Sequence, residues 1–161
     1  MFETFLQSFP LVKFPVTIRE DTYQEMGENN PPLGAEMIAK YLACFNETGD
    51  DDEMTEYIAC FSLPKANAFV GVIFWKAGLL TYDYFLATYT HAGMPLDCLR
   101  VAGTTVERET IIQAIATIRD DWNVNIIQGR YAASGAALPV AANSKPSVFE
   151  VLDDGKIVQL I

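Results

Sequence analysis

Few residues in this chain could carry out chemistry, and none of them belongs to a recognised catalytic motif. His91 is the only histidine among the 161 residues, and a histidine can act as a general base or bind a metal. No second histidine accompanies it, and it lies beside Gly93 in a predicted turn, where polar residues are common. Ser134 lacks the flanking glycines of a nucleophile elbow. We predict no catalytic residue and favour a protein that is not an enzyme; carboxylate pairs that form only in the folded chain carry no sequence motif.

Four consecutive acidic residues, Asp50, Asp51, Asp52 and Glu53, form the densest cluster of charge in the sequence. Carboxylates this close together could bind a hard cation such as Ca²⁺. The run follows Gly49 and has no glycine after it, so it lacks the ligand spacing and the central glycine of a calcium-binding loop. We therefore predict no metal and no cofactor. We interpret the stretch as a solvated loop that could dock a basic partner.

Aromatic residues gather in one region of the chain: Trp75, Tyr82, Tyr84, Phe85 and Tyr89. Tyrosine and tryptophan combine an apolar ring with a polar group, and they often line pockets or interfaces. Two interpretations stay open. The residues could pack into a core with their hydroxyl groups at its margin. Alternatively, Trp75, Tyr82, Tyr84 and Tyr89 could line a ligand pocket.

The formal net charge of −10 is concentrated between Arg19 and Glu56, where eleven acidic residues accompany only two basic ones. Phosphate groups and anionic lipids are bound by basic patches. We therefore expect neither nucleic acid nor a membrane surface as a partner. No apolar run approaches the roughly 18 residues of a membrane-spanning helix.

Cys44, Cys60 and Cys98 favour a reducing compartment. Their number is odd, no C-x-x-C occurs, and their spacing fits neither a disulfide framework nor a zinc site. We interpret them as small core residues. The first residues contain neither a basic leader nor a long apolar segment, so we expect no signal peptide and a cytoplasmic protein.

The elements that would position these residues centre on residues 68–102, which read as three antiparallel strands joined by two tight turns. Residues 68–76, 79–90 and 96–102 are rich in aromatic and β-branched residues, and glycines separate them. In the first strand Phe69, Ile73 and Trp75 share one face and Val70, Val72 and Phe74 the other; in the second, Leu80, Tyr82, Tyr84 and Leu86 oppose Leu79, Phe85 and Tyr89. Because both faces are apolar, we expect this sheet to curl on itself or to be capped by a helix.

The remaining elements follow from apolar periodicity and turn residues. In chain order we expect helix 2–9, strand 14–18, loop 19–32, helix 34–45, an acidic loop, strand 57–63, a turn at 103–105, strand 109–119, strand 122–131, loop 132–147, and a hairpin of 148–152 with 156–161 around Asp-Gly. Residues 109–119 also fit a helix, but their isoleucines and threonines favour a strand. The predicted fold class is α+β, mainly β: one domain over residues 1–161, with a broad antiparallel meander sheet of about nine strands and one or two helices from the N-terminal half.

Three sequence features together resemble a family of small β-rich bacterial proteins. These are the opening F-x-x-F followed by F-P-V-T-I, the segment L-A-T-Y-T-x-x-G, and the Asp-Gly hairpin near the end. The resemblance covers about half of the chain and implies a bacterial, strand-rich protein. That family has no assigned activity or catalytic residues, so the resemblance implies no function.

Two hypotheses for function remain. The first is a soluble, non-enzymatic binding protein whose acidic segment faces a basic protein partner. The second is a small-ligand carrier, with a cavity lined by the aromatic group inside a curled sheet. We also expect that the strand ending at Ile161 could pair with a second copy of the chain.

Overall fold

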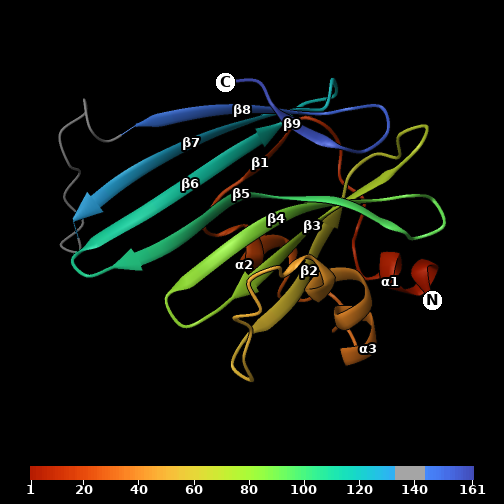
Figure 1. Ribbon diagram of the computed structural model, residues 1–161, viewed down its shortest axis with the longest axis horizontal. Helices are drawn as coiled ribbons and strands as arrows, with labels where there is room; N and C mark the ends of the chain where they lie inside the picture. Colours follow the sequence, from red (N-terminus) through yellow and green to blue (C-terminus); the bar gives the residue numbers. More distant parts are fainter. Residues whose placement is uncertain (133–143) are drawn as a thin grey trace.

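The computed structural model describes residues 1–132 and 144–161, and within them nine strands form one antiparallel sheet (Figure 1). Strands β2 to β9 follow one another in chain order, while the short β1 pairs with β6. The predicted mainly β fold, an antiparallel meander of nine strands, is therefore confirmed. The strands are β1 (Val16–Ile18), β2 (Glu56–Ser62), β3 (Val70–Ala77), β4 (Thr81–Tyr89), β5 (Pro95–Glu107), β6 (Thr110–Ile118), β7 (Asn123–Ala132), β8 (Lys145–Val151) and β9 (Ile157–Gln159).

Side-chain alternation along β3 and β4 puts a separate apolar core on each face of the sheet. Residues of one parity contact the inner core: Phe69, Ile73, Trp75, Tyr84 and Leu86. Residues of the other parity contact the outer core: Val72, Phe74, Phe85, Ala87 and Tyr89. The face assignments made from the sequence for these residues are correct, because a strand buried on both faces keeps its period of two.

The inner core is enclosed because the sheet folds over itself at β5. β5 pairs with β4 over most of its length, but it pairs with β6 only through its last residues, from Gly103 to Glu107. Beyond that point β1 takes the place of β5 beside β6. The two halves of the sheet therefore pack face to face. The interior holds buried side chains from both, among them Phe61, Ile73, Val101, Ile118 and Val124.

The hairpin of β8 and β9 is tied back to the first half of the sheet. The hydroxyl of Thr88 donates a hydrogen bond to the carbonyl of Gly155 at 2.7 Å, and Thr88 is fully buried. The backbone N–H of Ile157 donates to the carboxylate of Asp97 at 2.8 Å. In the part of the chain that is described, β2 and β9 do not pair with each other, so the sheet stays open.

Two helical segments cover the outer face of β2 to β4 (Figure 1). The first is α1 (Phe2–Gln7), which buries Phe2, Phe5 and the following Phe9, as its spacing predicts. The second is the predicted helix over residues 34–45, which consists of α3 (Ala35–Met37), a π-helical turn η1 (Ile38–Leu42) and a 3₁₀ turn η2 (Ala43–Phe45). Both segments contribute rings that pack on Tyr89.

The prediction of a loop over residues 19–32 is wrong, because a short helix, α2 (Thr22–Met26), forms there. The ring of Tyr23 stacks on Trp75, with centroids 4.1 Å apart and planes within 10°. Beyond the helix, the side-chain amide of Asn30 lies 2.7 Å from the carbonyls of both Met26 and Ala59. Tertiary contacts of this kind fix a short helix that its polar sequence does not favour.

The predicted turn at residues 103–105 is also wrong, because this segment continues β5. Gly103 has φ +149 and pairs with Asp83 of β4. A Cβ at this position would lie 2.6 Å from the carbonyl oxygen of Tyr82, so the glycine permits a close approach of two strands. The register of β4 against β5 shifts between Tyr84 and Phe85, next to the Gly103 position. Gly103 therefore marks an irregularity within β5 and not a turn.

The other elements agree with the sequence analysis. Residues 109–119 are a strand, β6, and the β8–β9 hairpin forms around Gly155. Ala132 ends β7 and β8 begins at Lys145, so both ends of the predicted loop at 132–147 are strand; Ser134 and the other residues from 133 to 143 lie outside the described residues. None of the helices in the described part of the chain has the length and apolar character that a membrane span requires.

Candidate functional site

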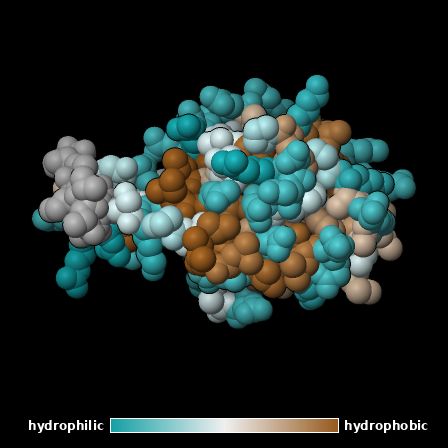
Figure 2. Space-filling model, turned by 90° about the horizontal axis from the view of Figure 1, so that it is seen from above, coloured by the Kyte–Doolittle hydropathy of each residue, from teal (hydrophilic) through white to brown (hydrophobic). Residues whose placement is uncertain are grey.

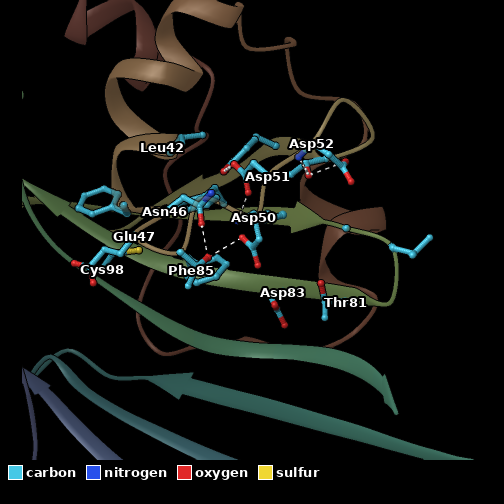
Figure 3. A pocket seen from close by; sticks show the side chains of 18 of the residues that line it. Leu42, Asn46, Glu47, Asp50, Asp51, Asp52, Thr81, Asp83, Phe85 and Cys98 are labelled. Carbon is cyan, nitrogen blue, oxygen red and sulfur yellow. Dashed lines mark hydrogen bonds and ion pairs between the residues drawn. The ribbon is translucent and has the colours of Figure 1, made fainter. Parts of the chain in front are cut away.

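A groove of about 780 Å³ lies on the outer face of the sheet, beside the acidic loop of residues 46–55 (Figure 3). Three aromatic rings from adjacent strands contribute to its floor: Tyr57 of β2, Phe74 of β3 and Phe85 of β4. The ring centroids of Tyr57 and Phe74 are 6.0 Å apart, and those of Phe74 and Phe85 are 5.2 Å apart. The volume is in the range of ligand pockets. We call this feature the acidic groove.

Carboxylates dominate the charge around the acidic groove. Six of them line it: Glu47, Asp50, Asp51, Asp52, Asp83 and Asp97. Among the described lining residues, Lys76 carries the only positive charge. The groove therefore joins an aromatic floor to an anionic wall, which is a combination that attracts cations with an apolar body.

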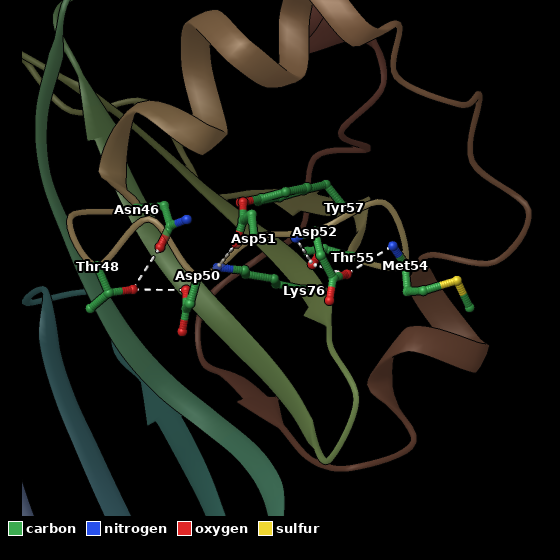
Figure 4. A network of polar contacts seen from close by, with 9 residues as sticks. All are labelled: Asn46, Thr48, Asp50, Asp51, Asp52, Met54, Thr55, Tyr57 and Lys76. Carbon is green, nitrogen blue, oxygen red and sulfur yellow. Dashed lines mark hydrogen bonds and ion pairs between the residues drawn. The ribbon is translucent and has the colours of Figure 1, made fainter.

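Asp51 anchors the acidic loop to the sheet (Figure 4). Its Oδ1 lies 2.6 Å from the ammonium of Lys76, and its Oδ2 accepts a hydrogen bond from the hydroxyl of Tyr57. Burial alone would raise the pKa of the Asp51 carboxyl, but the hydrogen bonds from Lys76 and Tyr57 outweigh it and hold that pKa below its ordinary value. Burial and the neighbouring Asp51 raise the pKa of Tyr57. At neutral pH this pair is therefore a carboxylate and a neutral phenol.

The flanking carboxylates shape the loop through local contacts. The hydroxyl of Thr48 lies 2.7 Å from Oδ1 of Asp50. Oδ1 of Asp52 accepts a hydrogen bond from the backbone N–H of Met54 at 2.8 Å. Asp50 and Asp52 are both exposed. Their negative charges therefore stand at the mouth of the groove, close to solvent.

The carboxylates on the opposite side have structural partners. Asp83 accepts a hydrogen bond from Nε of Arg100 at 2.7 Å. Asp97 accepts hydrogen bonds from the backbone N–H groups of Cys98 and Ile157. Because these carboxylates hold β4, β5 and β9 together, the loop supplies the carboxylates that are best placed to meet a partner.

Three of the four acidic residues singled out from the sequence, Asp50, Asp51 and Asp52, line the acidic groove, whereas Glu53 is exposed on the same loop outside the lining. Sequence reasoning did not find Tyr57, Phe74 and Lys76 as lining residues. Alternation along a strand predicts on which face of the sheet each of these side chains lies. Their proximity to one another depends on the register of β2 against β3, which the sequence does not reveal.

The four aromatic pocket candidates do not come together at one cavity. Tyr84 is buried in the inner core, where its hydroxyl lies 2.7 Å from the backbone nitrogen of Tyr23, which donates to it. Tyr89 is buried in the outer core and donates to the carbonyl of Tyr41 at 2.5 Å. The ring of Trp75 stacks with the rings of Tyr23 and Tyr82. Phe85, the fifth member of that aromatic group, is the one that lines the groove.

His91 and the cysteines occupy positions that sequence reasoning described only partly. His91 lies in the turn before β5, and its Nε2 is 2.8 Å from the carbonyl oxygen of Asn67. All three cysteines are free thiols. Cys60 is a core residue as expected, Cys98 lines the acidic groove, and Cys44 is exposed, so the core assignment is wrong for Cys44. In the described residues no group of three His, Cys, Asp or Glu side chains is arranged to hold a metal.

Comparisons with known proteins add no relative. No protein-family model matches the chain, and no curated protein or solved structure is detectably similar to it.

Proposed function

We propose that this chain is a binding protein whose acidic groove takes a basic, partly apolar segment of a protein partner. The observation that supports the proposal most directly is the pairing of an aromatic floor with an anionic wall. Six carboxylates and one ammonium line the groove, above the rings of Tyr57, Phe74 and Phe85. An apolar side chain gains from contact with the rings, while a nearby cation gains from the carboxylates.

Electrostatics favours a basic partner over other classes. The net charge of −10 repels phosphate groups, and the carboxylates of the loop strengthen that repulsion at the groove itself. The same field speeds the encounter with a cationic partner and makes its rate depend on salt. The groove is also large enough for several side chains, so a peptide segment fits it better than a single ion does.

The test uses a short, fluorescently labelled peptide in which lysine alternates with leucine, and a matched peptide in which glutamine replaces lysine. Fluorescence anisotropy should show saturable binding of the lysine peptide that weakens as salt increases, and much weaker binding of the glutamine peptide. Absence of binding at low salt, or equal binding of both peptides, would reject the proposal.

The matched protein variant should spare Asp51, because that residue anchors the loop. Reversing Asp50, Asp52 and Glu53 to lysine should slow association by about tenfold or more at low salt. The control reverses three exposed acidic residues that do not line the groove, Glu25, Glu28 and Asp120, and gives the same change in net charge. Equal slowing in both variants would mean that the overall charge, and not the loop, determines the rate.

A second surface supports pairing with a second copy of the chain, through the edge formed by β9. Figure 2, which views the molecule from the side of β8 and β9, shows hydrophobic side chains exposed among hydrophilic ones. Large exposed apolar residues of this region include Val158, Leu160 and Ile161. Edge strands with apolar residues tend to pair. Light scattering measures the mass directly: Val158→Lys should shift a dimer toward monomer, and a wild-type monomer at high concentration would reject this pairing.

A further inference from the structure

One cation already lies in the acidic groove, and it belongs to the chain itself. The ammonium of Lys76 is 2.6 Å from Oδ1 of Asp51 and 5.6 Å from the centroid of the Tyr57 ring. The Lys76 and Asp51 side chains are only 20% and 24% exposed. A carboxylate and an aromatic ring beside one ammonium, in a partly buried setting, are two features that recognise a primary amine.

The two oxygens of Asp51 have different partners, which restricts the kind of cation that fits. Oδ2 accepts the hydroxyl of Tyr57, so only Oδ1 is directed to the ammonium. A guanidinium group binds a carboxylate best through two parallel hydrogen bonds, which require both oxygens. An ammonium needs a single oxygen, and its narrow stem can lie along a ring. The site therefore suits lysine better than arginine.

A second carboxylate lies within reach of the Lys76 side chain. The direct neighbour of Lys76 across the β3–β4 ladder is Asp83, whose carboxylate lines the same groove and accepts a hydrogen bond from Arg100 through Oδ1. Directly opposed residues of an antiparallel pair have Cβ atoms about 5 Å apart. The lysine side chain has four rotatable bonds. The Lys76 ammonium can therefore move from Asp51 to Asp83 without any movement of the backbone.

We propose that Lys76 occupies the position that the ammonium of a partner's lysine side chain takes on binding. In the free protein, the ammonium of Lys76 fills the ammonium site between Asp51 and Tyr57. In the complex, the ammonium of the partner's lysine fills this site, and Lys76 pairs with Asp83. This inference rests on the proposed function and names the chemical group that enters the groove.

The direct test is rescue of a deleted side chain by a small molecule. Lys76→Ala removes the ammonium and the three methylene groups beyond Cβ, and n-butylammonium chloride supplies an ammonium on an apolar chain one carbon longer. The melting temperature of Lys76→Ala should rise with n-butylammonium by several degrees more than that of the wild-type protein, because the ligand binds the folded state. Neutral n-butanol should not reproduce the effect. The matched control is Arg100→Ala, which also removes one cation that pairs with a carboxylate lining the groove.

A second variant keeps the test informative if Lys76→Ala does not fold. Lys76→Met keeps the length of the side chain and removes its charge. The Lys76→Met variant should bind the lysine–leucine peptide at least about tenfold more tightly than Arg100→Met does. Both variants lose one positive charge, but only Lys76→Met leaves the ammonium site empty. An otherwise identical arginine–leucine peptide should gain less from Lys76→Met than the lysine peptide gains.

The outcomes separate this inference from the proposed function. If the wild-type protein binds the lysine peptide, but Lys76→Met and Arg100→Met bind it equally and n-butylammonium rescues neither alanine variant selectively, then the inference is overturned and the proposed function stands. If n-butylammonium raises the melting temperature of Lys76→Ala but no peptide binds, the ammonium site exists and the proposed function fails.

Discussion

Lys76 of β3 and Asp51 of the acidic loop form an ion pair of 2.6 Å that joins the loop to the sheet. The same carboxylate accepts the hydroxyl of Tyr57 on β2, so one side chain holds the loop to two strands. The loop has no regular secondary structure between residues 46 and 55. We infer that this contact fixes the shape of the groove and that its loss would open it.

Asp51→Asn should loosen the loop. The amide keeps the size of the side chain but loses the charge that pairs with Lys76. Since both side chains are largely buried, we expect a loss of about 1–2 kcal/mol in the free energy of unfolding, measured in urea. Asp50→Asn removes the same charge from an exposed position and should cost less than about 0.5 kcal/mol. Equal losses in the two variants would contradict an anchoring role for Asp51.

The contribution of Asp51 should also depend on pH in a defined direction. Burial raises its pKa, but the hydrogen bonds from Lys76 and Tyr57 dominate, so the net pKa in the folded protein is lowered. The folded state then binds fewer protons than the unfolded state. The stabilisation is therefore complete above the ordinary aspartate pKa of about 3.9 and is lost as the pH falls through the lower folded value.

The measurement is the difference in unfolding free energy between wild type and Asp51→Asn, at about pH 7 and again at about pH 3. The difference should shrink toward zero in acid, because the protonated Asp51 resembles the amide. A difference that stays constant or grows in acid would mean that the pKa is not lowered in the folded state.

Gly103→Ala should destabilise the fold strongly. A Cβ at this position would lie 2.5 Å from Oδ1 of Asp83 and 2.6 Å from the carbonyl oxygen of Tyr82, and φ is +149. We expect a loss of about 2–4 kcal/mol in the free energy of unfolding. Gly34→Ala is the matched control, because nothing lies within 4 Å of its Cβ position, and it should cost less than about 1 kcal/mol. Similar losses would show that β4 and β5 tolerate a side chain at this close approach.

The three thiols should react at different rates. Burial raises the pKa of all three thiols, but Cys44 is exposed, whereas the pKa values of Cys60 and Cys98 are raised to about 12. Only the thiolate attacks an alkylating reagent. In the native protein at neutral pH, iodoacetamide should therefore modify Cys44 first, and Cys44→Ser should abolish the fast phase. Mass spectrometry measures the rate of modification of each thiol. Equal rates for all three would contradict the burial of Cys60 and Cys98.

Sequence reasoning succeeded where local signals agreed with each other. Alternation along residues 70–89 predicted which side chains of β3 and β4 share a face, because both strands are buried on both sides. Asp-Gly between alternating runs predicted the β8–β9 hairpin, and β-branched residues predicted that β6 is a strand. These features depend on neighbours in the chain.

It failed where distant segments decide the structure. Pairing of β1 with β6 links residues about a hundred positions apart, and no local pattern encodes it. The helix α2 depends on the stacking of Tyr23 on Trp75. The acidic run predicted a charged loop, but the aromatic floor beneath it requires the register of three strands and the contact of Asp51 with Lys76. For that reason the groove could not be predicted, although three of its acidic residues, Asp50, Asp51 and Asp52, were identified.

The most direct test of the central claim, that the acidic groove is the binding site for a lysine-bearing segment, is an NMR titration of the isotopically labelled protein with the lysine–leucine peptide. We predict that amide shifts change at lining residues of the groove, at Asp50, Asp51, Tyr57, Lys76 and Phe85, and that the changes saturate and weaken with salt. Shift changes confined to the β8–β9 side of the molecule, or none at low salt, would contradict the claim.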